Sequence, residues 1–383
     1  MKKQNTFLAM FLLAIAGCDS NKPSTDALIT IDVTANYSKK ELILQDILDV
    51  EYIPMETTND FITQGIVLAV GKEIILVKNQ INDGIIFVFD RNGKGLRKIN
   101  RMGRGSEEYY RILEVMLDEG NNEIFVNGSN GIFVYDLYGN FKRRFQIYEK
   151  GNYRFLQNFN REHLICKESI VGEIRRNSTE SLPLIVASKS DGSVVKDIQF
   201  HFKEGVNTIV ELESGYIAPR VNSIIPYRDS WLLTESSSDT IFKLMPDFTL
   251  TPFIARIPSI HAMNSKIFLY PVLLTENYYF MESLKREYDF DSRSGFPRKK
   301  LMYDIKEKKT YEYVIYNGDY STKKDLDISI STRVDEIAFW QKIEAFELVE
   351  SNKKGELKGK LKEIAENLKE DDNPVIMLVK YKK

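Results

Sequence analysis

The sequence predicts an all-β protein, a six-bladed β-propeller with seven blades as the alternative count, with a short C-terminal helix and a closing strand. Three observations support this prediction. Short runs rich in Ile, Val, Phe and Tyr alternate with Gly, Asn and Asp, one hairpin pattern repeats, and the chain length fits six such repeats. Two β-sandwiches whose hairpins resemble each other by chance are the alternative, but they would not explain the fixed spacing of the repeat.

Residues 1–17 predict a lipoprotein signal peptide. Two lysines precede an apolar run from Phe7 to Ile15, which is too short to span a bilayer because a spanning helix needs ~20 residues. Two small residues follow, and then Cys18. This order resembles the lipobox of bacterial lipoproteins, which implies that Cys18 becomes the first mature residue and carries acyl chains. An uncleaved anchor, or a chance cysteine in a plain signal peptide, is the alternative.

Residues 18–27 are polar and contain a proline, so we expect a flexible tether between the anchor and the folded domain. A tether of this length spans at most ~30 Å, which keeps the domain close to the membrane. The propeller domain is therefore expected over residues 28–383. An early strand from Val50 to Pro54 is a candidate for closing the ring.

The repeated hairpin is the strongest local signal. Its first copy runs from Ile85 to Ile99 and its second from Gly131 to Phe145, with the same residues 46 positions apart. The matched pairs are Asp90 with Asp136 and Gly93 with Gly139. Weaker copies follow at Leu184–Ser188, Thr240–Leu244 and Lys300–Asp304. A period of ~45–55 residues is typical of propeller blades, because one blade cannot bury both of its apolar faces alone.

The C-terminal region changes in character. Residues 353–370 are charged, with an apolar stripe that predicts one helix, and Asn373-Pro374 ends it because the residue before a proline avoids the helical conformation. The members of the stripe are Leu357, Leu361, Ile364 and Leu368. Val375 to Val379 then reads as a buried strand. Since a ring closes by pairing its two ends, this strand is expected to take part in closure.

Several stretches resemble the six-bladed β-propeller lipoproteins of Bacteroidetes-type bacteria. They lie in the opening strand, the first hairpin, the segment after it and the final strand, at residues 49–58, 89–94, 103–109 and 372–375. Ser106 stands where that family has a proline. The resemblance implies a propeller fold and an exported, lipid-anchored location. It implies no catalytic role, because the family shares no common reaction.

Charge and cysteine content restrict the partners and the redox chemistry. Without Lys2 and Lys3 the mature chain carries 51 basic and 55 acidic residues, so nothing suggests a nucleic-acid partner. The two cysteines are Cys18 and Cys166. Acylation of Cys18 leaves Cys166 without a disulfide partner, and its apolar surroundings predict a buried, inert thiol. The fold must then be stabilised by its core.

The densest polar segment gives five candidate ligand-contact residues, namely Arg101, Arg104, Glu107, Glu108 and Tyr109. Its glycines allow close backbone approach, and the two arginines could hold a carboxylate or phosphate. The segment lacks the lysine and hydroxyl residue of a nucleotide-binding loop. The favoured interpretation is structural, an inter-blade turn in which Glu107 or Glu108 binds backbone N–H groups.

No cofactor or metal is expected, since the three histidines, His163, His201 and His261, have no metal-like spacing. We therefore expect a membrane-anchored propeller that acts as a non-catalytic binding or scaffolding module of the cell envelope. Its expected partners are the membrane, through acylated Cys18, and an envelope protein, peptide or glycan. The outer membrane is favoured, with the leaflet left open. The alternative is an envelope hydrolase or lyase that acts on a polysaccharide or peptide in the propeller channel.

Overall fold

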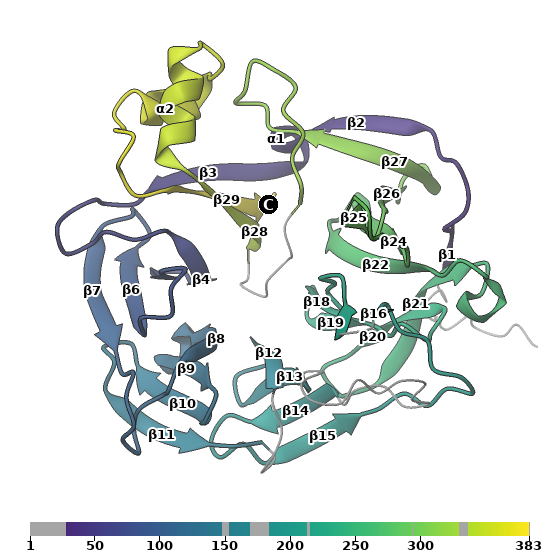
Figure 1. Ribbon diagram of the computed structural model, residues 1–383, viewed down its shortest axis with the longest axis horizontal. Coiled ribbons are helices and arrows are strands. Elements are labelled where there is room, and N and C mark those ends of the chain that lie inside the picture. Colours follow the sequence, from purple (N-terminus) through teal and green to yellow (C-terminus); the bar gives the residue numbers. More distant parts are fainter. Residues whose placement is uncertain are drawn as a thin grey trace, which may run out of the picture.

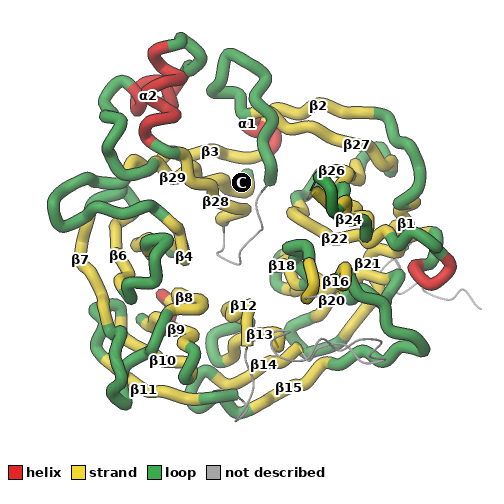
Figure 2. Tube along the Cα trace, in the orientation of Figure 1, coloured by secondary structure: helices red, strands yellow, loops and turns green. Residues whose placement is uncertain are grey.

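A computed structural model describes residues 28–147, 153–168, 184–212, 215–292, 294–328 and 336–382. Its strands form six blades arranged around a central axis (Figure 1). The predicted six-bladed propeller is therefore confirmed. Cys18 and the predicted signal peptide and tether lie outside the described residues. Strands make up about half of the described chain, and the few helices lie at the rim beside one blade or between strands (Figure 2).

Blades 1 to 3 are each built from one continuous part of the chain, with four antiparallel strands in sequence order. Blade 1 consists of β4 (Ile66–Val70), β5 (Ile74–Lys78), β6 (Ile85–Asp90) and β7 (Gly95–Asn100). Blade 2 consists of β8 (Ile112–Asp118), β9 (Glu123–Gly128), β10 (Gly131–Asp136) and β11 (Phe141–Phe145). Blade 3 consists of β12 (Tyr153–Asn158), β13 (His163–Glu168), β14 (Leu184–Ser188) and β15 (Val194–Ile198). The first strand of each blade lies nearest the axis (Figure 1).

Blades 4 and 5 each receive a fifth, outer strand from the N-terminal part of the chain, and this strand pairs in parallel. Blade 4 consists of β18 (Ile224–Tyr227), β19 (Ser230–Thr234), β20 (Thr240–Leu244), β21 (Leu250–Ile257) and β1 (Ile29–Asp32). Blade 5 consists of β22 (Ile267–Leu274), β23 (Tyr278–Lys285), β26 (Arg298–Asp304), β27 (Lys309–Tyr316) and β2 (Lys39–Ile43).

Blade 6 closes the ring with strands from both ends of the domain. It consists of β28 (Ile337–Ile343), β29 (Val375–Tyr381) and β3 (Leu48–Pro54), in that order from the axis outward. Strand β29 pairs antiparallel with β3 from Val375↔Pro54 to Tyr381↔Leu48. The prediction that the final strand and the Val50–Pro54 strand take part in closure is therefore confirmed.

The remaining elements are short. They are the hairpin strands β16 (Val210–Leu212), β17 (Gly215–Ile217), β24 (Tyr288–Asp289) and β25 (Ser294–Gly295), the 3₁₀ turns η1 (Glu119–Asn121) and η2 (Ile260–Ala262), and the helices α1 (Leu44–Ile47), α2 (Ala345–Lys353) and α3 (Gly359–Ala365). No helix in the described ranges is long and apolar enough to cross a membrane.

Of the single helix predicted over residues 353–370, only Gly359–Ala365 forms a helix, α3, and a turn separates it from α2, which ends at Lys353. Gly355 sits in this turn at φ +72°, a left-handed conformation that ends α2. The predicted apolar stripe nevertheless marks the buried face, because Leu357 and Leu361 are almost fully buried against the core. The charged residues gave no sign of the turn between α2 and α3, since polar residues are common both in helices and in turns.

The hydrogen bonds of the repeated hairpins explain why Asp and Gly recur at matching positions in the sequence. Asp90 Oδ1 accepts hydrogen bonds from the backbone N–H groups of Asn92 (2.8 Å) and Lys94 (2.9 Å). In the second copy Asp136 Oδ1 accepts the equivalent bonds from residues 138 and 140, at 2.8 and 2.9 Å. The matched glycines Gly93 and Gly139 have φ values of +84° and +87°. The 46-residue spacing therefore reflects one turn built twice.

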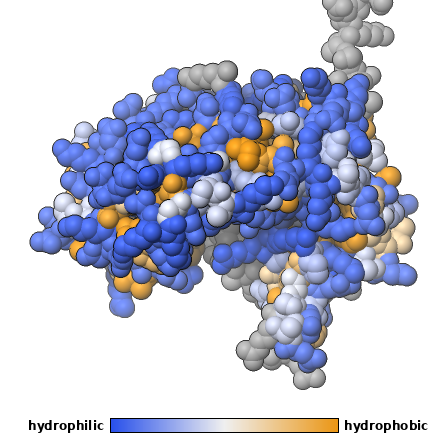
Figure 3. Space-filling model, turned by 90° about the horizontal axis from the view of Figure 1, so that it is seen from above, coloured by the Kyte–Doolittle hydropathy of each residue, from blue (hydrophilic) through white to orange (hydrophobic). Residues whose placement is uncertain are grey.

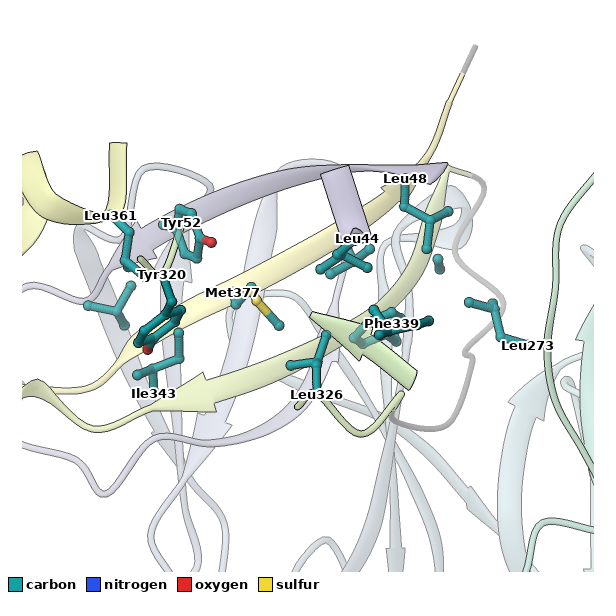
Figure 4. Packing of buried hydrophobic residues seen from close by; sticks show 14 of the residues in the cluster. Leu44, Leu48, Tyr52, Leu273, Tyr320, Leu326, Phe339, Ile343, Leu361 and Met377 are labelled. Atoms are coloured by element: carbon teal, nitrogen blue, oxygen red, sulfur yellow. The ribbon is translucent and has the colours of Figure 1, made fainter. Parts of the chain in front are cut away.

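Six buried apolar clusters each join two neighbouring blades, and together they form the core. Figure 4 shows the cluster between blades 5 and 6, where Leu44, Leu48 and Tyr52 of the N-terminal segment meet Phe339 and Met377. Seen edge-on, the surface is mostly hydrophilic, with scattered apolar patches (Figure 3).

Cys166 lies in the cluster between blades 2 and 3 as a free, fully buried cysteine, and burial raises the pKa of its thiol. The prediction of a buried thiol is therefore confirmed.

Candidate functional site

A pocket of about 750 Å³ lies at one end of the central axis, within the range of small-molecule sites of ~300–1,000 Å³. The C-terminal ends of the inner strands β4, β8 and β12 and the loops that follow them form its wall. Trp340 of the inner strand β28 and Lys189 of the β14–β15 turn complete it. Four of the six blades therefore contribute to this site.

The buried Lys189–Asp118 pair connects blades 3 and 2 at the pocket wall. Lys189 Nζ lies 2.6 Å from Asp118 Oδ2, and both side chains are less than one-tenth exposed. Lys189 also donates to the carbonyl oxygen of Asn160 (2.7 Å), while Asn121 Nδ2 donates to Asp118 Oδ2 (2.8 Å). Burial lowers the pKa of Lys189, although the Asp118 carboxylate opposes this effect. The pair therefore has a structural role in holding two blades together.

Glu119 has a comparable role between blades 2 and 1. Its carboxylate accepts hydrogen bonds from the backbone N–H groups of Lys72, Glu73 (3.1 Å) and Ile74 (3.1 Å). A side chain at Gly71 would overlap this carboxylate, because a Cβ there would lie 2.2 Å from Glu119 Oε1. The two acids at the end of β8, Asp118 and Glu119, are therefore both engaged in bonds that support the fold.

Other polar groups on the wall keep hydrogen-bonding capacity that the fold does not use. Asn158 Nδ2 donates to the Leu117 carbonyl oxygen (2.7 Å), but its buried Oδ1 has no hydrogen-bond partner. Within the described part of the chain, no hydrogen bond or ion pair involves the side chains of Gln157, Arg161 or Trp340. These groups can donate to and accept from a molecule in the pocket without disturbing the fold.

Among the described residues, no group of three or more His, Cys, Asp or Glu side chains is arranged to hold a metal ion. His163 Nδ1 lies 3.1 Å from Asn160 Oδ1, and His261 Nε2 lies 3.0 Å from the Ser237 carbonyl oxygen. His201 is exposed at the surface.

The five candidate residues from the sequence lie at the other end of β8. Their segment connects the outer strand β7 of blade 1 to the start of β8, whereas the pocket lies where β8 ends. Tyr109 is fully buried, and its hydroxyl donates to the Gly84 carbonyl oxygen (2.7 Å) and accepts from the Arg101 N–H (3.1 Å). Arg101 Nε donates to the Gly139 carbonyl oxygen (2.8 Å), which links blades 1 and 2.

The two glutamates of the segment also accept hydrogen bonds that stabilise the turn. Glu108 Oε2 accepts a hydrogen bond from the Gly105 N–H (2.7 Å), and the Glu107 carbonyl oxygen accepts one from the Tyr135 hydroxyl (2.7 Å). Arg104 is exposed. The segment is thus the inter-blade turn of the favoured interpretation. Ligand contact by these five residues stays a prediction, and they do not line the 750 Å³ pocket.

Sequence reasoning missed the pocket residues. Nothing local distinguishes the inner strand of a blade from its other strands, so the ends of β4, β8 and β12 could not be recognised as neighbours. A usable signal was present in Gln157-Asn158, because two amides at the end of an apolar strand serve no obvious packing purpose.

Residues 28–380 match the family model described as "Domain of unknown function (DUF4934)". The chain belongs to this family. The match extends over nearly the whole described propeller, so the DUF4934 domain is the six-bladed ring itself. No curated protein matches this chain.

This DUF4934 domain is similar to several solved structures. A "putative exported protein" from Bacteroides fragilis aligns with a TM-score of 0.59 at 14% identity, over 93% of this chain and 100% of that one. A member of the DUF4221 family from Bacteroides vulgatus aligns with a TM-score of 0.46 at 11% identity, over 88% and 98%. Virginiamycin B lyase from Staphylococcus aureus aligns with a TM-score of 0.33 at 9% identity, over 66% and 73%. At 14% identity, the first of these likenesses shows the fold alone.

Proposed function

We propose that this DUF4934 protein is an exported lipoprotein whose propeller acts as a non-catalytic binding module of the cell envelope. The observation that carries the proposal is the pocket at the end of the axis. The side chains of Gln157 and Arg161 on its wall have no role in the fold, whereas two of its three acids, Asp118 and Glu119, support the fold. That distribution suits binding better than acid–base chemistry.

The anchor is proposed from the sequence. Cys18 follows a short apolar segment and two small residues, and residues 18–27 provide a polar tether. The first described strand, β1, lies at the outer edge of blade 4, so the tether would join the ring at its rim. The outer membrane is the favoured location, and the exported relative from Bacteroides fragilis supports export.

The Cys18→Ser variant tests the anchor. Without the sulfur that receives the acyl chains, we expect the protein to move from the membrane fraction to the soluble fraction after cell lysis. Cys166→Ser is the matched control, since Cys166 is the only other cysteine and is fully buried, and this variant should stay with the membrane. Unchanged partitioning of Cys18→Ser would contradict the lipoprotein assignment.

Binding at the pocket is tested with glycan arrays and with capture from detergent-solubilised envelopes, using wild type and Arg161→Ala. The arginine side chain is exposed on the pocket wall, so its loss should weaken ligand capture without affecting folding. Equal capture by both proteins would place the binding site elsewhere. Shortening of a captured polysaccharide or peptide by the wild type would instead support the hydrolase or lyase alternative.

A further inference from the structure

We infer that the ligand of this pocket is an uncharged saccharide, whose sugar ring packs on Trp340 and whose hydroxyl groups bind the amides of Gln157 and Asn158. This inference rests on the proposed function, because it names the ligand class of the same pocket. Three independent features of the wall lead to it: its charge balance, its aromatic surface and its unused amides.

The charges on the pocket wall cancel. Three acidic and three basic side chains line it, namely Glu73, Asp118 and Glu119 against Lys72, Arg161 and Lys189. Asp118 and Lys189 neutralise each other directly at 2.6 Å. A site for phosphate, nucleic acid or an acidic polymer gathers an excess of positive charge, which is absent from this lining. The balance therefore favours an uncharged, polar ligand.

Trp340 provides a fixed aromatic surface at the edge of the pocket. Trp340 packs against the apolar cluster between blades 6 and 1, and the residue is only partly buried and also lines the pocket. Because β28 pairs with β29 at Trp340↔Leu378, the backbone that carries the ring is held in a sheet. A ring held in this way offers a flat apolar face and an indole N–H donor, which match the C–H face and the hydroxyls of a pyranose.

The amides of Gln157 and Asn158 supply hydrogen-bonding capacity on blade 3, across the axis from Trp340 of blade 6. The bond from Asn158 Nδ2 to the Leu117 carbonyl oxygen fixes the orientation of that amide and leaves its buried Oδ1 without a donor. Gln157 keeps both its donor and its acceptor functions within the described part of the chain. A hydroxyl group both donates and accepts, so the hydroxyls of a sugar can donate to an amide oxygen and accept from an amide N–H group.

A peptide fits this wall less well, because peptides commonly bind an open strand edge through their backbone. The facing inner edges of blades 2 and 3 are already bridged by side chains. At the pocket, Asn158 Nδ2 donates to the Leu117 carbonyl oxygen (2.7 Å), and further along the strands, outside the pocket lining, Glu114 Oε2 accepts from the Leu156 N–H (2.9 Å). Side chains thus take the backbone groups that an added strand would need.

The experiment titrates the full mature chain, solubilised in detergent, with neutral hexasaccharides of glucose, mannose, xylose and N-acetylglucosamine. Intrinsic fluorescence reports binding at Trp340, because the chain has two tryptophans and the other, Trp231, is fully buried. We expect saturable binding to at least one neutral sugar at concentrations up to about 10 mM. A hexamer of galacturonic acid and a set of blocked neutral pentapeptides serve as the charged and peptide comparisons.

Calorimetry on variants locates the site. Trp340→Ala and Gln157→Ala should each weaken saccharide binding about tenfold or more, and Gln157→Ala keeps the test valid if loss of the indole disturbs the blade. Tyr110→Ala is the matched control, because this exposed aromatic residue lies in the turn before β8, at the end away from the pocket, and its loss should change nothing.

The outcomes separate this inference from the proposed function. No saturable binding of any neutral saccharide, or equal binding by wild type and Gln157→Ala, overturns the saccharide assignment. If the pentapeptides or the acidic hexamer bind instead and Gln157→Ala weakens them, the pocket is a binding site for another ligand, so only the saccharide inference fails. If Arg161→Ala, Gln157→Ala and wild type all capture envelope material equally, the proposed binding site itself fails.

Discussion

At the residue scale, the hairpin glycines do more than allow a tight turn. A Cβ at Gly93 would lie 2.0 Å from the Pro54 carbonyl oxygen of blade 6, and one at Gly139 would lie 2.8 Å from the Ile99 side chain of blade 1. A Cβ at Gly192 would lie 2.5 Å from the ring of Phe145, in blade 2. Each glycine therefore lies where its own blade contacts the preceding blade. The glycines recur in the sequence because this contact recurs between successive blades.

The Gly93→Ala variant is expected to lose about 2–4 kcal/mol of unfolding free energy. Left-handed backbone at an alanine costs ~1 kcal/mol, and overlap with the Pro54 backbone adds ~1–3 kcal/mol. Gly355→Ala is the matched control, since Gly355 also has a positive φ but a Cβ there would meet nothing within 4 Å. Urea unfolding that gives equal losses for both variants would show that the contact between blades has no energetic weight.

At the element scale, side chains on the outer strands fasten successive blades. Arg97 Nε on β7 donates to the Leu137 carbonyl oxygen (3.1 Å), and Arg143 Nε on β11 donates to the Lys189 carbonyl oxygen (3.0 Å). Arg143 also makes a bidentate pair with Glu123 of β9, at 2.6 and 2.7 Å. These arginines are 46 residues apart, so they belong to the same repeat as the hairpin turns.

The contribution of the Glu123–Arg143 pair to the unfolding free energy depends on pH. Burial alone would raise the pKa of Glu123, but hydrogen bonds from Arg143 and Lys142 outweigh it and hold the pKa below the usual 4.5. The unfolded chain then takes up a proton at higher pH than the folded one, so the stabilisation is present above pH 4.5 and is lost as pH falls through the lowered pKa. We expect wild type to exceed Glu123→Gln in unfolding free energy at pH 7, with the difference shrinking in acid.

The control for this series is Glu370→Gln. Glu370 pairs with Lys353, but both side chains are about two-thirds exposed, and exposed pairs contribute little. Chemical unfolding at several pH values should show no comparable change for this variant. A constant difference between wild type and Glu123→Gln from pH 7 to pH 3 would contradict the assignment.

Sequence reasoning predicted the elements whose partners are local or distinctive. The hairpins around Gly93 and Gly139 follow from turn chemistry, and the closing strand follows from an apolar run after Asn373-Pro374. The parallel strands β1 and β2 were not predicted, because Ile29 pairs with Ile254 and Lys39 with Glu312, and no local pattern encodes such distant partners.

The pocket was not predicted for a related reason. Its wall combines the ends of strands from different blades, and only the closed ring brings Gln157 and Trp340 to one site. The segment ending at Tyr109, in contrast, carries its turn chemistry in its own residues, and its structural role could be read from them.

At the scale of the whole molecule, Asn373 joins the two ends of the domain. It is 3% exposed, and its Oδ1 accepts from the Thr63 N–H (2.8 Å), while its Nδ2 donates to the carbonyl oxygens of Glu56 (2.7 Å) and Phe61 (2.6 Å). Its own N–H donates to Thr57 Oγ1 (2.8 Å). One buried side chain thus orders the loop that leads from the closing blade into blade 1.

Asn373→Ala should lower the unfolding free energy by about 3 kcal/mol. It leaves the buried Thr63 N–H and the part-buried carbonyl oxygens of Glu56 and Phe61 without partners, at ~1–3 kcal/mol each and partly relieved by water. Asn367→Ala is the control, since Asn367 is exposed and makes one hydrogen bond to the Glu363 carbonyl oxygen, and its loss should cost under about 0.5 kcal/mol. Calorimetric unfolding of both variants measures the difference. Equal costs would mean that closure does not depend on this residue.

The N-terminal strands also determine how the ring carries mechanical load. A pull on the chain ahead of Leu28, as a membrane anchor would exert, acts first on β1 at the edge of blade 4, then on β2 in blade 5, and only then on β3 in the closing blade. Two outer strands must therefore detach before force reaches the seam of the ring. The strands β1 and β2 would thus take up a force on an anchored terminus before it reaches the closing blade.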